Sequence, residues 1–160
     1  MIFLLAGHGG GDPGATGVDG RQEYREAIIL RDAIMRNLPS GHPMFIDSDQ
    51  DNLSTVLRKA RTGPGSVTLD IHFNAASSSV ATGVEVLVGD DAGPEDLMLA
   101  SDVLDVVLKH TKLRNRGIKK EGQTPRKRLG VMRESGAVCL LEVCFITNPG
   151  DMKAYDATRD

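Results

Sequence analysis

The chain has 160 residues, the length of one compact domain, and we expect a single domain over residues 1–160. Its content of 40% hydrophobic and 26% charged residues is that of an ordinary globular protein and argues against disorder. The net charge of −3 argues against a broadly basic nucleic-acid-binding surface, and two cysteines exclude a disulfide-dense scaffold. No apolar run approaches the ~20 residues that a membrane-spanning helix needs.

Strands alternate with helices along the chain. The first strand, at residues 1–6, lacks the basic start and the cleavage site of an export signal. A loop follows that holds seven of the 18 glycines between residues 7 and 20. Hydrophobic periodicity predicts helices at residues 21–38, 52–61 and 94–109, a basic loop at 112–128, and further strands at 43–46, 67–73, 83–88 and 138–145. Because some strands are apolar on both faces, the predicted fold is α/β, a twisted, mostly parallel sheet with helices on both faces.

Three side chains that can bind a metal are expected at the carboxyl end of this sheet, where such folds bind ligands. His8 lies just beyond the first strand, Glu23 continues an apolar helical stripe near that loop, and His72 ends the strand at 67–73. Each also has a plain structural explanation: a hydrogen-bonding loop histidine, a first-turn helix charge and a half-buried histidine. Two histidines and one glutamate, with a fourth position open to water, are a known catalytic zinc arrangement.

Glu142 interrupts the apolar run at residues 137–145. Burying an unpaired, charged carboxylate in such a strand costs on the order of several kcal/mol, unless its pKa rises so that it becomes neutral. A structural ion pair is one explanation. We favour a general acid or base that burial holds near a neutral pKa.

The segment from Lys109 to Arg128 contains nine basic residues and one acid, Glu121. A solvated face is the default interpretation, and attraction to an anionic polymer is the functional one. The segment has no interleaved aromatic residues, which argues against single-stranded nucleic acid. The glycine loop also lacks the lysine and hydroxyl ending of a phosphate-binding loop, which argues against a nucleotide enzyme.

Four motifs occur together in the chain: Gly7–Gly17, Glu23 at the start of a helix, Ile71–Ala75 and Leu141–Pro149. Together they resemble the type 3 family of zinc-dependent N-acetylmuramoyl-L-alanine amidases, which includes bacterial cell-wall amidases and phage endolysins. Arg116-Gly117 and Leu129–Arg133 are also similar to the family. The resemblance covers nearly the whole chain in the family's order. It implies one zinc ion held by His8, Glu23 and His72, with Glu142 as the catalytic carboxylate. It also implies cleavage of the amide between the lactyl group of N-acetylmuramic acid and L-alanine in peptidoglycan.

The chain departs from the family's pattern at three places. Ala6-Gly7 stand where the family commonly has aspartate and proline or alanine, and Asp70 stands where serine is usual. We expect Asp70 either to orient a metal ligand or to face solvent. Asn74 and Arg133 are further candidates for contacts to ligands or substrate. The family's closing helix, finally, has only the residues up to Asp160 in which to form.

The resemblance and the absence of a recognisable leader favour a single-domain phage endolysin, which we expect to be a monomer without a nucleic-acid partner. Such a protein is made in the cytoplasm without a signal peptide and reaches the cell wall through a holin-type pore protein. A bacterial enzyme whose leader has been removed is the alternative setting. Two other functions compete: a zinc carboxypeptidase or peptidase that acts on wall peptides, and a cell-wall-binding module without catalysis.

Overall fold

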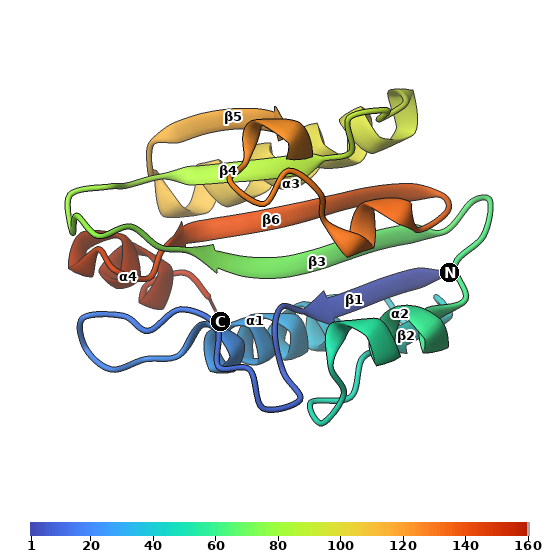
Figure 1. Cartoon of the computed structure of the whole chain (residues 1–160), viewed down its shortest axis with the longest axis horizontal. Helices are drawn as coiled ribbons and strands as arrows, with labels where there is room; N and C mark the ends of the chain where they lie inside the picture. Colours follow the sequence, from blue (N-terminus) through green and yellow to red (C-terminus); the bar gives the residue numbers. More distant parts are fainter. Residues whose placement is uncertain (160) are drawn as a thin grey trace.

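The computed structural model describes residues 1–159 and contains six strands; Asp160 lies outside the described residues. The strands are β1 (Ile2–Ala6), β2 (Met44–Ile46), β3 (Val67–Asn74), β4 (Val84–Val88), β5 (Asn115–Lys120) and β6 (Ala137–Phe145). They form one sheet in the order β2-β1-β3-β6-β4-β5 (Figure 1). Strands β2, β1, β3 and β6 are parallel, whereas β4 is antiparallel to β6 and parallel to β5. The predicted α/β fold with a mostly parallel sheet is confirmed.

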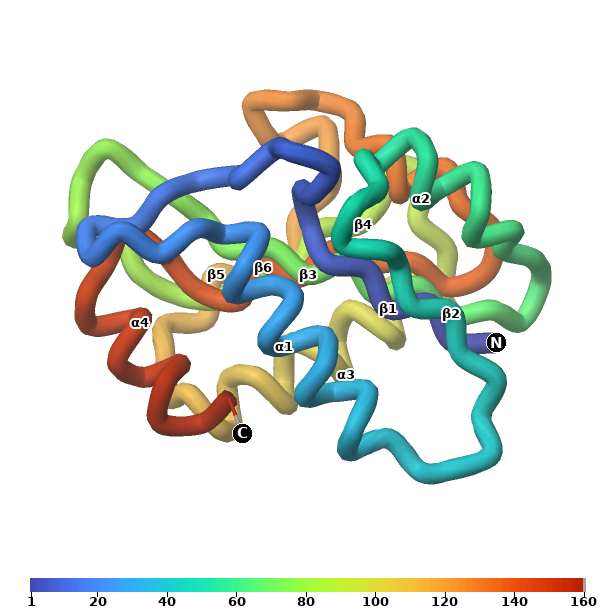
Figure 2. Tube along the Cα trace, turned by 90° about the horizontal axis from the view of Figure 1, so that it is seen from below, coloured from blue at the N-terminus to red at the C-terminus, as the bar shows by residue number. Residues whose placement is uncertain are grey.

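Helices cover both faces of the sheet unequally. The α-helices are α1 (Glu23–Asn37), α2 (Leu53–Ala60), α3 (Pro94–Thr111) and α4 (Pro149–Asp156), and two short 3-10 helices are η1 (Glu121–Gln123) and η2 (Gly130–Arg133). Helices α1, α3 and α4 lie on one face, and α2 lies on the other together with the segment around η2 (Figures 1 and 2). Within residues 1–159, none of the helices has both the length and the apolar character needed to cross a membrane.

The two faces therefore carry hydrophobic cores of different size. The larger core lies under α1, α3 and α4 and includes Ile71, Phe73 and Leu141. The smaller core, under α2 and η2, includes Val131 and Leu140. Because side chains alternate between the faces of a strand, neighbours of Ile71 and Leu141 project from the less covered face. That face carries the polar side chains described below.

Strand β5 lies within the segment that the sequence predicts to be a basic loop, so that prediction is wrong for Asn115–Lys120. Ile118 is the single aliphatic side chain of the strand, which leaves no alternation of apolar and polar residues to detect. β5 pairs with β4 alone and forms one edge of the sheet. Charged residues, lysine above all, are typical of edge strands because they discourage pairing with another chain.

The closing helix α4 is short but well anchored. The Asn148 side chain accepts hydrogen bonds from the backbone N–H groups of Gly150 and Asp151, and Pro149 occupies the first turn. The Tyr155 ring packs edge-on against Phe73, with ring centroids 5.0 Å apart. Eight residues are therefore enough to cover this part of the larger core.

Candidate active site

A cleft of about 710 Å³ opens on the less covered face, at the carboxyl ends of β1, β3 and β6. Its lining includes all four residues that the sequence singles out for catalysis or metal binding: His8, Glu23, His72 and Glu142. They come from a loop, a helix and two strands, and the topology of the sheet brings them together. The cleft thus lies at the end of the sheet where the sequence analysis expects a ligand to bind, and the four residues meet there.

His8 is presented by a strained turn directly after β1. Its φ angle of 70° is in the left-handed region, which residues with a side chain rarely adopt. Two backbone hydrogen bonds of 3.1 Å between Gly9 and Asp12 close the turn. The Asp12 carboxylate lies 2.9 Å from His8 Nδ1, and this contact leaves Nε2 directed at Glu23 Oε2, 3.0 Å away.

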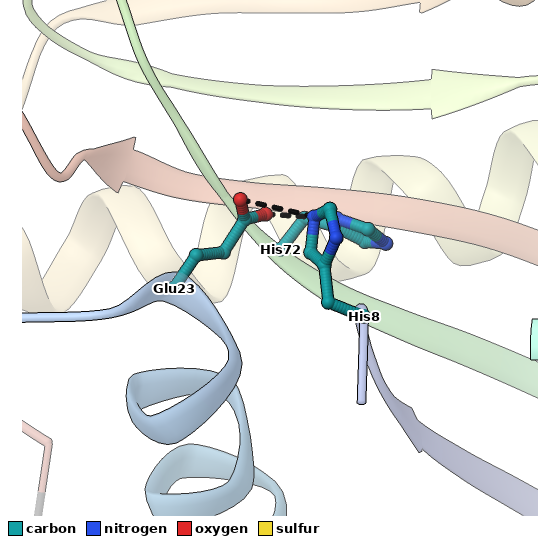
Figure 3. Close-up of side chains that lie close together, drawn as sticks. All are labelled: His8, Glu23 and His72. Atoms are coloured by element: carbon teal, nitrogen blue, oxygen red, sulfur yellow. Dashed lines mark hydrogen bonds and ion pairs between the residues drawn. The ribbon is translucent and has the colours of Figure 1, made fainter. Parts of the chain in front are cut away.

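Glu23 is the first residue of α1 and is 5% exposed, as the apolar stripe predicts. Its Oε1 lies 2.9 Å from His72 Nδ1 and accepts a hydrogen bond from the Phe73 N–H, and its Oε2 accepts one from the Ala15 N–H. Figure 3 shows the three side chains converging from their separate elements. Glu26, one turn further along, is equally buried but lies 4.0 Å from Arg21 instead. The two glutamates are thus equally buried, but their side chains point to different partners: Glu23 to the two histidines and Glu26 to Arg21.

His72 stands on β3 with a second carboxylate behind it. Its Nε2 lies 3.4 Å from Asp70 Oδ2, so Asp70 points into the protein rather than into solvent. Two glycines leave room for this arrangement. A Cβ atom on Gly7 would lie 2.4 Å from His72 Cε1, and one on Gly14 would lie 2.7 Å from Glu23 Oε2. The glycine loop therefore allows the backbone to approach the side chains of His72 and Glu23 closely.

His8, Glu23 and His72 form a group able to hold a metal ion. One nitrogen or oxygen atom from each lies within 4.8 Å of the others, and no second such group occurs among residues 1–159. Burial acts to lower the pKa of both histidines, but neighbouring carboxylates outweigh it: Glu23 and Asp12 raise the pKa of His8, and Asp70 and Glu23 raise that of His72. The site therefore favours positive charge, which a divalent cation can supply in place of protons.

Glu142 projects from β6 beside His72, its partner in the register of the two parallel strands. Its Oε2 is buried and has no hydrogen-bond partner within the described residues, where no ion pair to Glu142 is found either. Burial raises the pKa of this carboxyl to about 7, although His72 acts in the opposite direction. A carboxyl near its midpoint at neutral pH can both accept and donate a proton.

The remaining predicted residues have other partners. The Asn74 side chain donates a hydrogen bond to Glu85 Oε1, 2.9 Å away. Arg133 forms an ion pair with Glu121 and does not line the cleft. Asp12 and Glu85 were missed by the sequence reasoning. Glu85 carried the same signal that identified Glu142, a carboxylate inside an apolar strand.

Comparisons with known proteins agree with this geometry. No curated protein matches the chain in a sequence search. An N-acetylmuramoyl-L-alanine amidase from Clostridium difficile 630 superposes with a TM-score of 0.78 at 23% identity, covering 95% of this chain and 83% of that one. AmiC2, an amidase of Nostoc punctiforme, gives 0.71 at 21% identity, with 99% and 92% covered. The catalytic domain of CD27L, an endolysin targeting Clostridium difficile, gives 0.69 at 21% identity, with 96% and 86% covered.

These structures share the fold of the chain, and the sequence itself carries the assignment further. The family model Amidase_3, described as N-acetylmuramoyl-L-alanine amidase, matches residues 2–160. The chain therefore belongs to the Amidase_3 family and is an N-acetylmuramoyl-L-alanine amidase.

Proposed function

We propose that this amidase is a zinc-dependent hydrolase that cleaves the amide between the lactyl group of N-acetylmuramic acid and L-alanine in peptidoglycan. His8, Glu23 and His72 would hold the ion, and Glu142 would move the proton. The observation that carries the proposal is the convergence of two imidazoles and one carboxylate beside a fourth, unpaired carboxyl in one cleft. Family membership supports the substrate class.

The donor set fits zinc. Two imidazole nitrogens and one carboxylate oxygen are the ligands of known catalytic zinc sites that keep one position open. A bound Zn²⁺ supplies a Lewis acid for the scissile carbonyl and acidifies water at neutral pH. Each histidine also has a second carboxylate on the nitrogen that faces away from Glu23: Asp12 at 2.9 Å for His8 and Asp70 at 3.4 Å for His72. Such outer carboxylates fix the orientation of ligand histidines.

Glu142 would act first as a base and then as an acid. Its carboxylate takes a proton from the water whose oxygen forms the new bond to the carbonyl carbon. The carbon–nitrogen bond then breaks, and the proton passes from Glu142 to the departing nitrogen. The products are the free lactyl carboxylate and a peptide with a free amino group on L-alanine. A pKa of about 7 suits both transfers, because neither protonation state is strongly favoured at neutral pH.

Mass spectrometry of purified peptidoglycan after digestion tests the reaction. We expect free stem peptides that begin with L-alanine, and glycan strands that keep their lactyl groups. Peptides trimmed at their carboxyl ends would identify a carboxypeptidase instead. Absence of any released product would contradict hydrolysis and leave the alternative of a wall-binding module. A metal chelator is expected to abolish release, and added Zn²⁺ to restore it.

We also propose that the cleavage serves lysis of a bacterial host, as in a phage endolysin that a partner pore protein releases to the wall. The endolysin catalytic domain among the similar structures supports this setting. Expression of the chain in a bacterial cytoplasm tests it. Lysis is expected only when a membrane pore protein is expressed with it, and lysis without that protein would contradict the proposed route.

A further inference from the structure

A cationic wall faces the proposed metal ligands across the cleft. We use this name for Arg116 and Lys119, two residues of the edge strand β5 whose side chains line the cleft. Both contact Glu85 on the neighbouring strand β4: Arg116 Nε and Lys119 Nζ each donate a hydrogen bond of 2.6 Å to Glu85 Oε2. None of these three residues has a role in the proposed metal binding or proton transfer.

Glu85 holds the wall in place. Glu85 is 7% exposed, and its other oxygen accepts a hydrogen bond from Asn74, the last residue of β3, two positions after His72. The Arg116 guanidinium also lies over the Phe145 ring, 4.9 Å from its centroid. Two cations positioned by one carboxylate, an amide and an aromatic ring are held far more firmly than free surface lysines.

Neutralising Glu85 does not require both cations. One carboxylate between two positive side chains leaves an excess of one positive charge. Burial acts to raise the pKa of Glu85, but Lys119 and Arg116 together outweigh it and lower this pKa. Arg116 contacts Glu85 through Nε, and its two terminal nitrogens have no hydrogen-bond partner within residues 1–159. The wall therefore presents unused donors and positive charge to the cleft, which suits a carboxylate.

The chemistry of the substrate indicates which part of it can supply a carboxylate to this wall. The lactyl carboxyl of the glycan is already consumed in the amide that is cleaved. Free carboxylates of the intact substrate thus belong to its peptide. Resting on the proposed function, we infer that the cationic wall binds the free carboxylate of the amino acid that follows L-alanine. The peptide then extends over β4 toward β5.

The spacing of the strands agrees with this placement. Glu85 is the direct partner of Glu142 in the antiparallel pairing of β4 with β6. Neighbouring strands lie about 4.8 Å apart, so β5 lies about 10 Å from β6. Arg116 reaches back over Phe145 of β6 and shortens that gap. An extended peptide advances about 3.5 Å per residue, which brings the second residue from the cleaved bond within reach of the guanidinium.

Two muropeptides that differ at one group test the inference. In one, the residue after L-alanine carries a free α-carboxylate, and in the other it carries a carboxamide. The wild-type protein is expected to cleave the carboxylate form with a kcat/KM about tenfold to a hundredfold higher, the range for a charged hydrogen bond. Arg116→Gln and Lys119→Gln are each expected to reduce this preference toward one. Arg114→Gln, an exposed arginine outside the cleft, is the matched control and should keep it.

Binding measured by calorimetry to the Glu142→Gln protein provides a readout that needs no turnover. The carboxylate form should bind more tightly than the carboxamide form, and Arg116→Gln in the same background should remove the difference. Because each single wall variant leaves Glu85 with one cation, at least one of them should fold, which circular dichroism would check. Equal binding of the two forms by the protein with an intact wall would overturn the inference. Cleavage of neither form, or of a different bond, despite discrimination in binding would contradict the proposed reaction instead.

Discussion

Replacing Gly7 by alanine is expected to displace a proposed zinc ligand without altering the backbone. The ring of His72 lies directly over Gly7, and an added Cβ would approach three ring atoms to 2.4–2.6 Å. Ordinary contacts between such atoms are about 3.5 Å, so the ring has to move by about 1 Å. Gly7 is not among the positive-φ positions, so alanine can adopt its backbone conformation. The methyl group is therefore the entire perturbation.

A shift of that size separates His72 Nδ1 from the position that Glu23 and Asp70 now define. We expect the affinity for zinc to fall about 10- to 100-fold, the loss typical when the support of a ligand is removed. Competition against a chromophoric chelator measures this affinity directly. Gly63→Ala is the control, because a Cβ there has nothing within 4 Å. Wild-type zinc affinity in Gly7→Ala would refute the assigned position of His72, provided that the variant melts as a folded protein.

Three further substitutions test separate parts of the site. Glu142→Gln should retain zinc but lower kcat by about 100-fold or more, as expected for loss of a general base, whereas the exposed Glu95→Gln should leave kcat unchanged. Asp70→Asn should weaken zinc binding about tenfold in the chelator assay, and unchanged affinity would show that Asp70 does not orient His72. Glu85→Gln should lower the free energy of urea unfolding by about 1–3 kcal/mol at pH 7. Because Lys119 and Arg116 lower the pKa of Glu85 in the folded state, its contribution is present above the ordinary pKa and is lost on acidification. The difference between wild type and Glu85→Gln should therefore shrink below about pH 4.3, and a constant difference would contradict the assignment.

Two of the site residues that sequence reasoning found, Glu142 and Glu23, conflict with their local pattern. Glu142 is a carboxylate in an apolar strand, and Glu23 lies on an apolar helical stripe. Such conflicts are visible without a structure because they involve only neighbouring residues. In the folded protein, the carboxyl groups of Glu142 and Glu23 both line the same cleft.

What the sequence did not reveal depends on pairing between distant segments. The sequence of the edge strand β5 has no alternation of apolar and polar residues. Its strand conformation depends instead on its pairing with β4, the one strand beside it in the sheet. The partnership of Arg116 with Glu85 joins residues 31 positions apart and follows from that pairing. Gly7 stood out as a departure from the family's pattern, but its physical reason, the ring of His72, lies 65 residues further along the chain. Local patterns hold no information on such distances.

The antiparallel strand β4 has a consequence for how this enzyme can diversify. Strands β3 and β6 are neighbours in the sheet, yet the chain between them makes a long excursion through β4, α3 and β5. That single continuous stretch contributes the cationic wall, whereas the proposed ligands and Glu142 all lie outside it. Substrate preference can thus change through insertions, deletions or exchange of one segment, while the residues that break the bond stay as they are. A chimera that carries the corresponding segment of another amidase should show the peptide specificity of that enzyme and retain the catalytic residues of this one.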